Sequence, residues 1–113
     1  MSMIAAVVLA ALVTGAPVAD EKTTAGQLAG FCDSLDGASL ARCSAFIMPA
    51  VEQVKDPGPG TGVPKLCVPP WTTFHQLRAM FIIYVASHPD RARSQAVIVT
   101  LEMLADNFLC PVN

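Results

Sequence analysis

Charged residues are scarce in this sequence of 113 residues: Asp, Glu, Lys and Arg make up 14% of it, and only 7 of them are basic. The Lys and Arg are scattered along the chain, whereas phosphate binding needs a concentrated cationic surface. The sequence therefore argues against a nucleic-acid partner. An apolar content of 53% also separates it from disordered chains. One small folded domain suits this length.

The sequence also lacks a set of residues that would predict catalysis. Its two histidines, His75 and His88, fall in a first helical turn and at a helix corner, where structural roles are expected. Glu102 and Asp106 lie one helical turn apart, and a solvated helix face explains them more simply than acid–base chemistry. The glycines within residues 56–64 are not followed by the strand-to-helix turn with Lys that a phosphate-binding loop needs. We expect no enzyme and no cofactor.

The N-terminus is typical of an export signal. Residues 3–13 form an unbroken apolar run, which is too short to span a bilayer because a span takes about 20 residues. Small residues follow the run and then the charged part of the chain begins, as in a cleaved secretory signal. A retained anchor or a buried first helix is the alternative. We predict a signal peptide over residues 1–19, cut after Ala16 or Ala19, and a mature domain over residues 20–113 with no stable membrane insertion.

Four cysteines, an even number in a short exported chain, predict two disulfides. The rival interpretation is a zinc site, but no Cys-x-x-Cys or Cys-x-x-His spacing occurs, so no metal is expected. Three pairings are open until the helices are placed. Cys32 and Cys43 flank a tight turn between two helices. Cys67 and Cys110 are expected at the outer ends of two helices of similar length. These placements predict the pairs Cys32–Cys43 and Cys67–Cys110.

Apolar residues recur at helical spacing in four segments, which predicts an all-α domain of four helices stapled by the disulfides. The first helix covers residues 24–35 and turns Leu35 toward the core. The second begins near Ser39 and is either kinked at Pro49 or stopped at its charged end. Residues 56–64, rich in Pro and Gly, are predicted to form an exposed loop.

The third helix is expected to begin with a capping box, in which Thr73 accepts from the amide of Gln76 and the Gln76 side chain reaches back. Its stretch 79–86 is apolar on all sides, so it must be covered on more than one side. Either it is the central helix of the domain, or a second copy of the chain covers it. The second alternative predicts a homodimer through Met80, Ile83 and their neighbours.

The fourth helix is predicted over residues 91–107, with Ser87 or Asp90 as its cap and with Val97 and Leu101 on its inner face. Because it matches the third helix in length, we expect the two to form an antiparallel hairpin. The second disulfide would then close the open end of that hairpin.

A longer set of residues resembles a known family. It comprises Cys67-Val-Pro-Pro-Trp-Thr-Thr-Phe-His-Gln76, Tyr84-Val85, His88-Pro89, Arg91, Ala96, Phe108-Leu-Cys110-Pro111 and, upstream and in order, Leu28, Cys32, Cys43 and Phe46-Ile47. Over nearly all of its mature part the chain resembles the Rap/Tai family of immunity proteins. The resemblance implies a small, exported, all-helical and usually dimeric protein of the periplasm. It further implies that the protein binds and inhibits a peptidoglycan amidase delivered by type VI secretion.

Three positions depart from the family's pattern. Phe46 stands where Tyr is common, Pro49 where Gly is found, and Leu109 where Pro commonly precedes the last cysteine. Phe46 loses a hydroxyl group, and Pro49 should bend the second helix. The surface of that helix is therefore expected to differ from that of its relatives.

The residues expected to contact the partner follow from physical arguments. A protein that blocks a catalytic cleft needs a protruding element that is already rigid. The corner between the third and fourth helices, with His88, Asp90, Arg91 and Arg93, is one such element. The loop ending at Trp71 is the other, although Trp71 is expected first as a lid on the core. Arg and aromatic residues dominate binding hot spots. Reversing both Arg charges is expected to weaken binding without changing the melting temperature.

Two other functions are compatible with the sequence. A small periplasmic chaperone or stress protein would expose an apolar seam at low pH. A carrier of apolar ligands would need a cavity among the last three helices. An adjacent toxin gene, binding of unfolded clients after acidification, or copurified lipid would distinguish the three classes.

Overall fold

The computed structural model describes residues 22–112, and the predicted signal peptide over residues 1–19 lies outside them. The elements are α2 (Ala25–Asp33), α3 (Gly37–Lys55), α4 (Phe74–Ser87), the 3-10 helix η1 (Pro89–Arg91) and α5 (Ala96–Asn107). In this part of the chain the one β-type contact is an isolated bridge between Thr24 and Gln95. The prediction of an all-α domain with four helices is confirmed.

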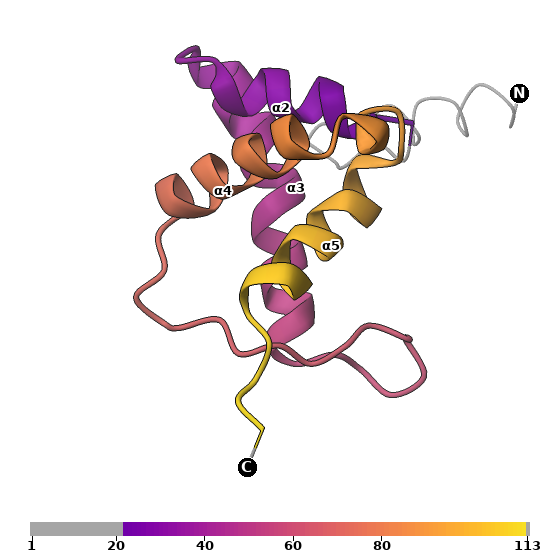
Figure 1. Ribbon diagram of the computed structural model, residues 1–113. Helices are drawn as coiled ribbons and strands as arrows, with labels where there is room; N and C mark the ends of the chain where they lie inside the picture. Colours follow the sequence, from indigo (N-terminus) through magenta and orange to yellow (C-terminus); the bar gives the residue numbers. More distant parts are fainter. Residues whose placement is uncertain (1–21, 113) are drawn as a thin grey trace, which may run out of the picture.

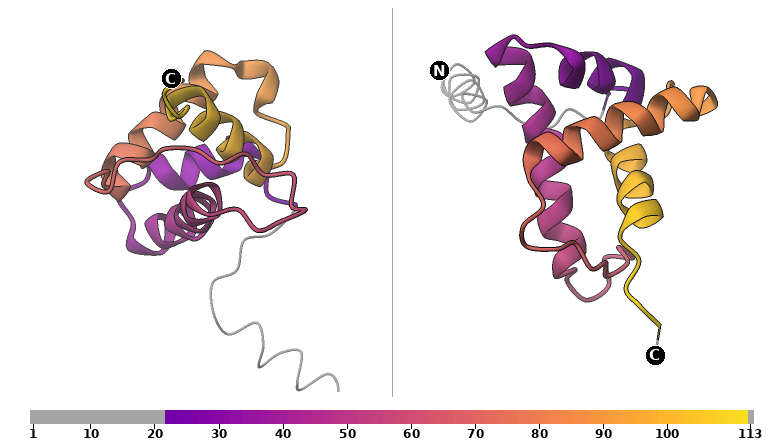
Figure 2. Two further views of the ribbon diagram at one scale, coloured as in Figure 1. Left: turned by 90° about the horizontal axis from the view of Figure 1, so that it is seen from below. Right: turned by 60° about the vertical axis from the view of Figure 1, so that its left-hand side comes forward.

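The four helices form a two-level arrangement. Figure 1 shows α2 and α4 running across one end of the molecule, with α3 and α5 running down from them. In Figure 2 the chain between α3 and α4 closes the lower end. The core lies where the four helices meet, and Leu28, Ile47, Phe81 and Met103 contribute one large buried side chain from each. None of the described helices combines the length and apolarity needed to cross a bilayer.

The predicted hairpin of the last two helices is wrong. α5 runs down from the far end of α4 and does not return along it (Figures 1 and 2). The chain between them is held on the first turn of α2, where Ala25 N–H donates to the Ser94 carbonyl and Gly26 N–H to that of Ala92, both at 2.8 Å. A helix leaves its first amides unpaired, so this connection satisfies them. Gly26 permits the approach, because a Cβ there would lie 3.2 Å from the Ala92 oxygen.

α5 also begins later than predicted. Its N-cap is Gln95, and neither Ser87 nor Asp90 caps it, because residues 89–91 form the separate 3-10 helix η1. Pro89 at the start of η1 fixes a tight turn there. The corner between α4 and α5 is therefore a longer connection than the sequence indicates.

The inner face of α5 is rotated from the predicted one. Its buried residues are Ala96, Val99, Thr100, Met103 and Leu104. Val97 and Leu101, expected inside, are only partly buried. Residues 97–99 are all apolar, so helical periodicity does not indicate which of them faces the core. Thr100 can lie inside because its hydroxyl donates to the Ala96 carbonyl at 2.7 Å.

The first two helices differ from prediction at their junction. α2 ends at Asp33, and Leu35, expected to pack inward, is 88% exposed. Asp36 accepts from Ser39 N–H at 3.1 Å and so caps α3 instead of merely ending α2. α3 continues through Pro49 to Lys55, so the proline does not end it.

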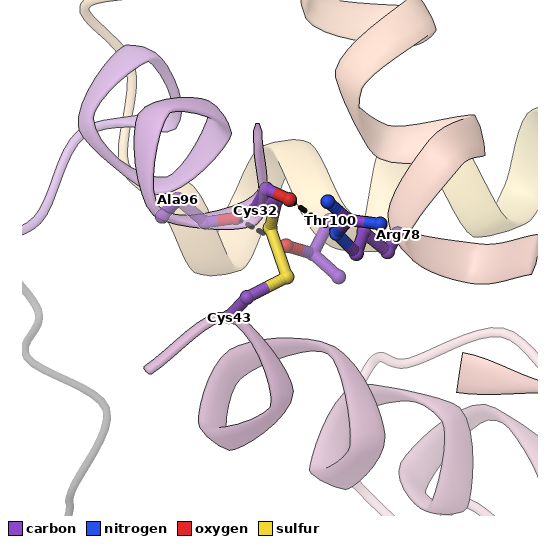
Figure 3. Close-up of a disulfide and its surroundings, with 5 residues drawn as sticks. All are labelled: Cys32, Cys43, Arg78, Ala96 and Thr100. Carbon is purple, nitrogen blue, oxygen red and sulfur yellow. Dashed lines mark hydrogen bonds between the residues drawn. A yellow bond between two sulfur atoms is a disulfide. The ribbon is translucent and has the colours of Figure 1, made fainter. Parts of the chain in front are cut away.

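Both predicted disulfide pairs are present, and all four cysteines are bonded. Cys32–Cys43 is fully buried between α2 and α3, and Figure 3 shows the Arg78 Nε of α4 donating to the Cys32 carbonyl beside it. Cys67–Cys110 joins the chain before α4 to the chain after α5, where Cys67 N–H also donates to the Phe108 carbonyl at 2.8 Å. Among residues 22–112 no cluster of metal-ligating side chains occurs.

Candidate partner-binding surface

α4 has two different faces. Leu77, Phe81 and Val85 lie at helical spacing and are buried in the core. Met80 is partly buried on the other side, and Ile83 is 64% exposed. Within one chain, α4 is therefore not the fully enclosed central helix that was one of the two expectations. The expected homodimer through Met80 and Ile83 stays a prediction.

The exposed side of α4 borders two depressions. One, of about 480 Å³, is lined by Pro69, Trp71, Thr72, Gln76, Ala79, Met80, Asn107 and Phe108. The other, of about 260 Å³, is lined by Met80, Ile83, Tyr84, Ser87, His88, Asp106 and Asn107. Both linings include Met80 and Asn107, so the depressions form one continuous surface between α4 and the end of α5. We call this surface the α4–α5 groove.

Trp71 stands at one end of the α4–α5 groove. It is 75% exposed, so the expectation that it covers the core is wrong and the alternative of an exposed side chain holds. The cause is local: Thr72 N–H donates to the Pro69 carbonyl at 3.1 Å, which forms a turn just before the Thr73 cap of α4. This capping box with Gln76, predicted from the sequence, is present.

His88 stands at the other end of the groove, where α4 ends. Its Nδ1 lies 2.8 Å from the Tyr84 carbonyl oxygen, which can only accept, so Nδ1 carries the hydrogen. The His88 ring also stacks on the Tyr84 ring with centroids 4.1 Å apart. These contacts hold both rings in place at the corner.

The charged residues of the corner are not equivalent. Arg91 donates to both carboxylate oxygens of Glu102, at 3.0 and 2.6 Å, and this bond raises the pKa of Arg91. Asp90 and Arg93 are exposed and make no hydrogen bond or ion pair within the described part of the chain. Reversing the charge of Arg91 would place it against Glu102 and destabilise the corner. Arg93 is therefore the residue whose charge can be reversed without disturbing the fold.

The structure thus brings the two predicted contact elements onto one surface. Trp71 and His88 line its ends, and the corner with Asp90, Arg91 and Arg93 continues beyond His88. Sequence reasoning missed the residues that connect them, which are Tyr84, Asp106, Asn107 and the groove-facing side of Phe108. Tyr84 and Phe108 do occur in the stretches that carry the family resemblance, and this signal could have indicated them.

Carboxylates make the corner end of the groove negative. The pKa of Tyr84 is raised above its ordinary 10.0, first by partial burial of the phenol and then by the nearby charges of Glu102 and Asp106. Glu102 is engaged by Arg91, so it does not form an acid–base pair with Asp106. The described side chains at this end of the groove therefore offer a surface for binding.

Titration of Tyr84, the chain's one tyrosine, tests this field. We expect its tyrosinate absorbance to appear with a midpoint above 10.0, and Asp106→Asn to move the midpoint down. The raised pKa means that the folded state holds this proton more tightly than the unfolded state. The stability that this tighter proton binding contributes is fully present below pH 10.0, the ordinary pKa of tyrosine. It is lost as the pH rises through the higher pKa that Tyr84 has in the folded state. A midpoint in Asp106→Asn equal to that of the parent chain would show that this carboxylate does not act on the groove.

Comparison with family models decides the identity. The model that describes Rap1a immunity proteins matches residues 24–110, which include all four helices, both disulfides and the α4–α5 groove. The chain belongs to the family of Rap1a immunity proteins. No curated protein and no solved structure gives a match. The resemblance seen in the sequence is confirmed.

Membership of the Rap1a immunity family sets the general role of the protein. An immunity protein binds a protein effector and inhibits it, so the family implies an inhibitor and not an enzyme.

Proposed function

We propose that this chain acts in the periplasm, where it binds and inhibits a peptidoglycan amidase delivered by type VI secretion. The match to Rap1a immunity proteins over residues 24–110 carries the proposal. The chaperone and ligand-carrier alternatives receive no comparable support from the family.

The disulfides support the proposed compartment. All four cysteines are bonded in two disulfides, one of them joins residues 43 positions apart, and Cys67 is exposed to solvent. Disulfides form and persist in oxidising compartments such as the bacterial periplasm. An export signal over residues 1–19, predicted from the sequence, agrees with this compartment.

The contact residues proposed for the amidase are Trp71, His88, Asp90, Arg91 and Arg93. Trp71 and His88 line the α4–α5 groove, and Asp90, Arg91 and Arg93 follow His88 along the chain, in a segment that is already held in place. The corner is bonded to α2 by Ala92 and Ser94, and His88 is fixed on Tyr84. A preorganised surface loses less conformational entropy on binding than a loose one.

A protection assay tests the proposed function. A peptidoglycan amidase captured with the mature chain is directed to the periplasm of a host bacterium, with and without this chain and its signal. We expect the chain to prevent lysis and the purified mature protein to inhibit hydrolysis of isolated peptidoglycan at one equivalent. Continued lysis in the presence of correctly folded, exported chain would contradict the proposal.

Trp71→Ala is expected to weaken binding of the amidase by about 2 kcal/mol, or about 30-fold, because aromatic residues dominate binding hot spots. Stability should be unchanged within about 0.5 kcal/mol, because Trp71 is 75% exposed. Calorimetric titration measures the affinity and urea denaturation measures the stability. Leu35→Ala is the control, an apolar residue at the junction of α2 and α3 that is 88% exposed. Equal affinities for the two variants would remove Trp71 from the contact.

A further inference from the structure

The corner end of the α4–α5 groove combines an apolar lining with a free carboxylate. Met80, Ile83 and Tyr84 supply the apolar surface, and Asp106 lies among the lining residues. Within the described part of the chain Asp106 has neither a hydrogen bond nor an ion pair, and it is exposed. A long basic side chain has the complementary form, an aliphatic stem that packs on apolar surface and a charged head that meets a carboxylate.

The nearest cation does not neutralise this end of the groove. Arg91 is already bound through two hydrogen bonds to Glu102. Among the described residues, Asp106 and Asp90 are two unpaired carboxylates against one unpaired cation of the corner, Arg93. The charges of both carboxylates add to the burial that raises the pKa of Tyr84. Charge complementarity thus favours a cationic occupant over an anionic or neutral one.

The other end of the groove has a different chemistry. Trp71, Met80 and Phe108 line a wider depression, with Gln76 and Asn107 as polar neighbours and no charged residue in the lining. An aromatic or large aliphatic side chain suits such a lining. Because the two ends share Met80 and Asn107, one ligand segment can occupy both.

We propose, on the basis of the proposed function, that the α4–α5 groove receives an effector segment carrying a bulky apolar residue and a Lys or Arg. The apolar side chain packs against Trp71 and Phe108, and the basic side chain reaches Asp106. Asp106 and Phe108 lie two positions apart at the end of α5, on either side of Asn107, and so within about one helical turn of each other, roughly 5.4 Å. Two residues of an extended chain cover a similar length, about 6.8 Å, so the pattern is apolar-x-basic.

A second copy of the chain is a poorer occupant of this groove. In a two-fold dimer the groove of one copy faces the groove of the other, and the lining contains no Lys or Arg that could meet Asp106. The partner that the groove fits is therefore a different protein with a basic segment.

Short peptides test the proposal on the full mature chain, with Trp71 as the reporter because it is the chain's one tryptophan. Acetyl-Phe-Gly-Arg-amide is compared with acetyl-Phe-Gly-citrulline-amide, which replaces the cation by a neutral group of the same shape. We expect a saturable change of Trp71 emission and affinity for the Arg peptide about three- to five-fold higher, the size typical of an exposed ion pair. Added salt should reduce the difference.

Asp106→Asn should lower affinity for the Arg peptide to that for the citrulline peptide. Asp33→Asn is the matched control, because Asp33 is exposed at the end of α2, on the side of α4 where Arg78 bonds to Cys32. Equal affinities for the two peptides, no saturable response, or no effect of Asp106→Asn would overturn the proposal. A dimer found by sedimentation that dissociates in Ile83→Glu would also overturn it, because a second copy would then occupy the groove.

The outcomes separate this inference from the proposed function. If the chain inhibits the amidase but binds both peptides equally, the proposed function stands and the apolar-x-basic pattern is wrong. If the chain distinguishes the peptides but inhibits no amidase, the proposed chemistry of the groove stands and the proposed class of effector is wrong.

Discussion

Replacing Cys67 and Cys110 together by serine is expected to lower the free energy of unfolding by about 4 kcal/mol. The two residues are 43 positions apart, so the bond restricts a long loop of the unfolded chain. Besides this bond, the buried side chains of Leu66 and Val68 hold the chain between α3 and α4. The Leu66 and Cys67 amides there also donate to the carbonyls of Val54 and Phe108. Urea denaturation of the two proteins measures the difference.

The same variant is expected to weaken effector binding. Cys67 and Cys110 join the chain that carries Trp71 to the chain that carries Phe108, and these aromatic residues line one depression of the groove. Without the bond, binding would have to order both segments, which costs affinity. Lys65→Ala, an exposed neighbour, is the control and should change stability by less than about 0.5 kcal/mol. A loss below about 1 kcal/mol for the double serine variant would show that the unfolded chain is not restricted as the loop length implies.

The disulfides show how a correct prediction can rest on a wrong geometry. Cys32 and Cys43 flank a tight turn, so the local sequence is sufficient to pair them. The pairing of Cys67 with Cys110 was inferred from an antiparallel hairpin of the last two helices, which does not exist. The chain between α3 and α4 instead crosses the lower end of the molecule and brings Cys67 to the end of α5 (Figure 2).

Some features of the site follow from the local sequence, and others follow from contacts between distant parts of the chain. The capping box at Thr73 and Gln76 depends on residues three apart, and the sequence predicted it. The position of Asp106 in the groove depends on where α5 lies relative to α4. That position follows from the bonds of Ala92 and Ser94 to α2, which join residues far apart in the chain. Periodicity along one helix carries no information about such contacts.

Phe81→Ala is expected to lower the free energy of unfolding by about 3–5 kcal/mol, as large-to-small changes of a buried aromatic residue do. Phe81 is fully buried on the core side of α4, and the helices around it cannot close the space that the ring leaves. Ile83→Ala, two residues away on the exposed side, should change stability by less than about 1 kcal/mol. Urea denaturation gives both values, and calorimetry with the amidase gives the affinities.

We expect Phe81→Ala, while it stays folded, to bind nearly as well as the parent chain, and Ile83→Ala to bind less tightly. The opposite order would mean that α4 presents its core side to the partner, and the assignment of the α4–α5 groove would then be wrong.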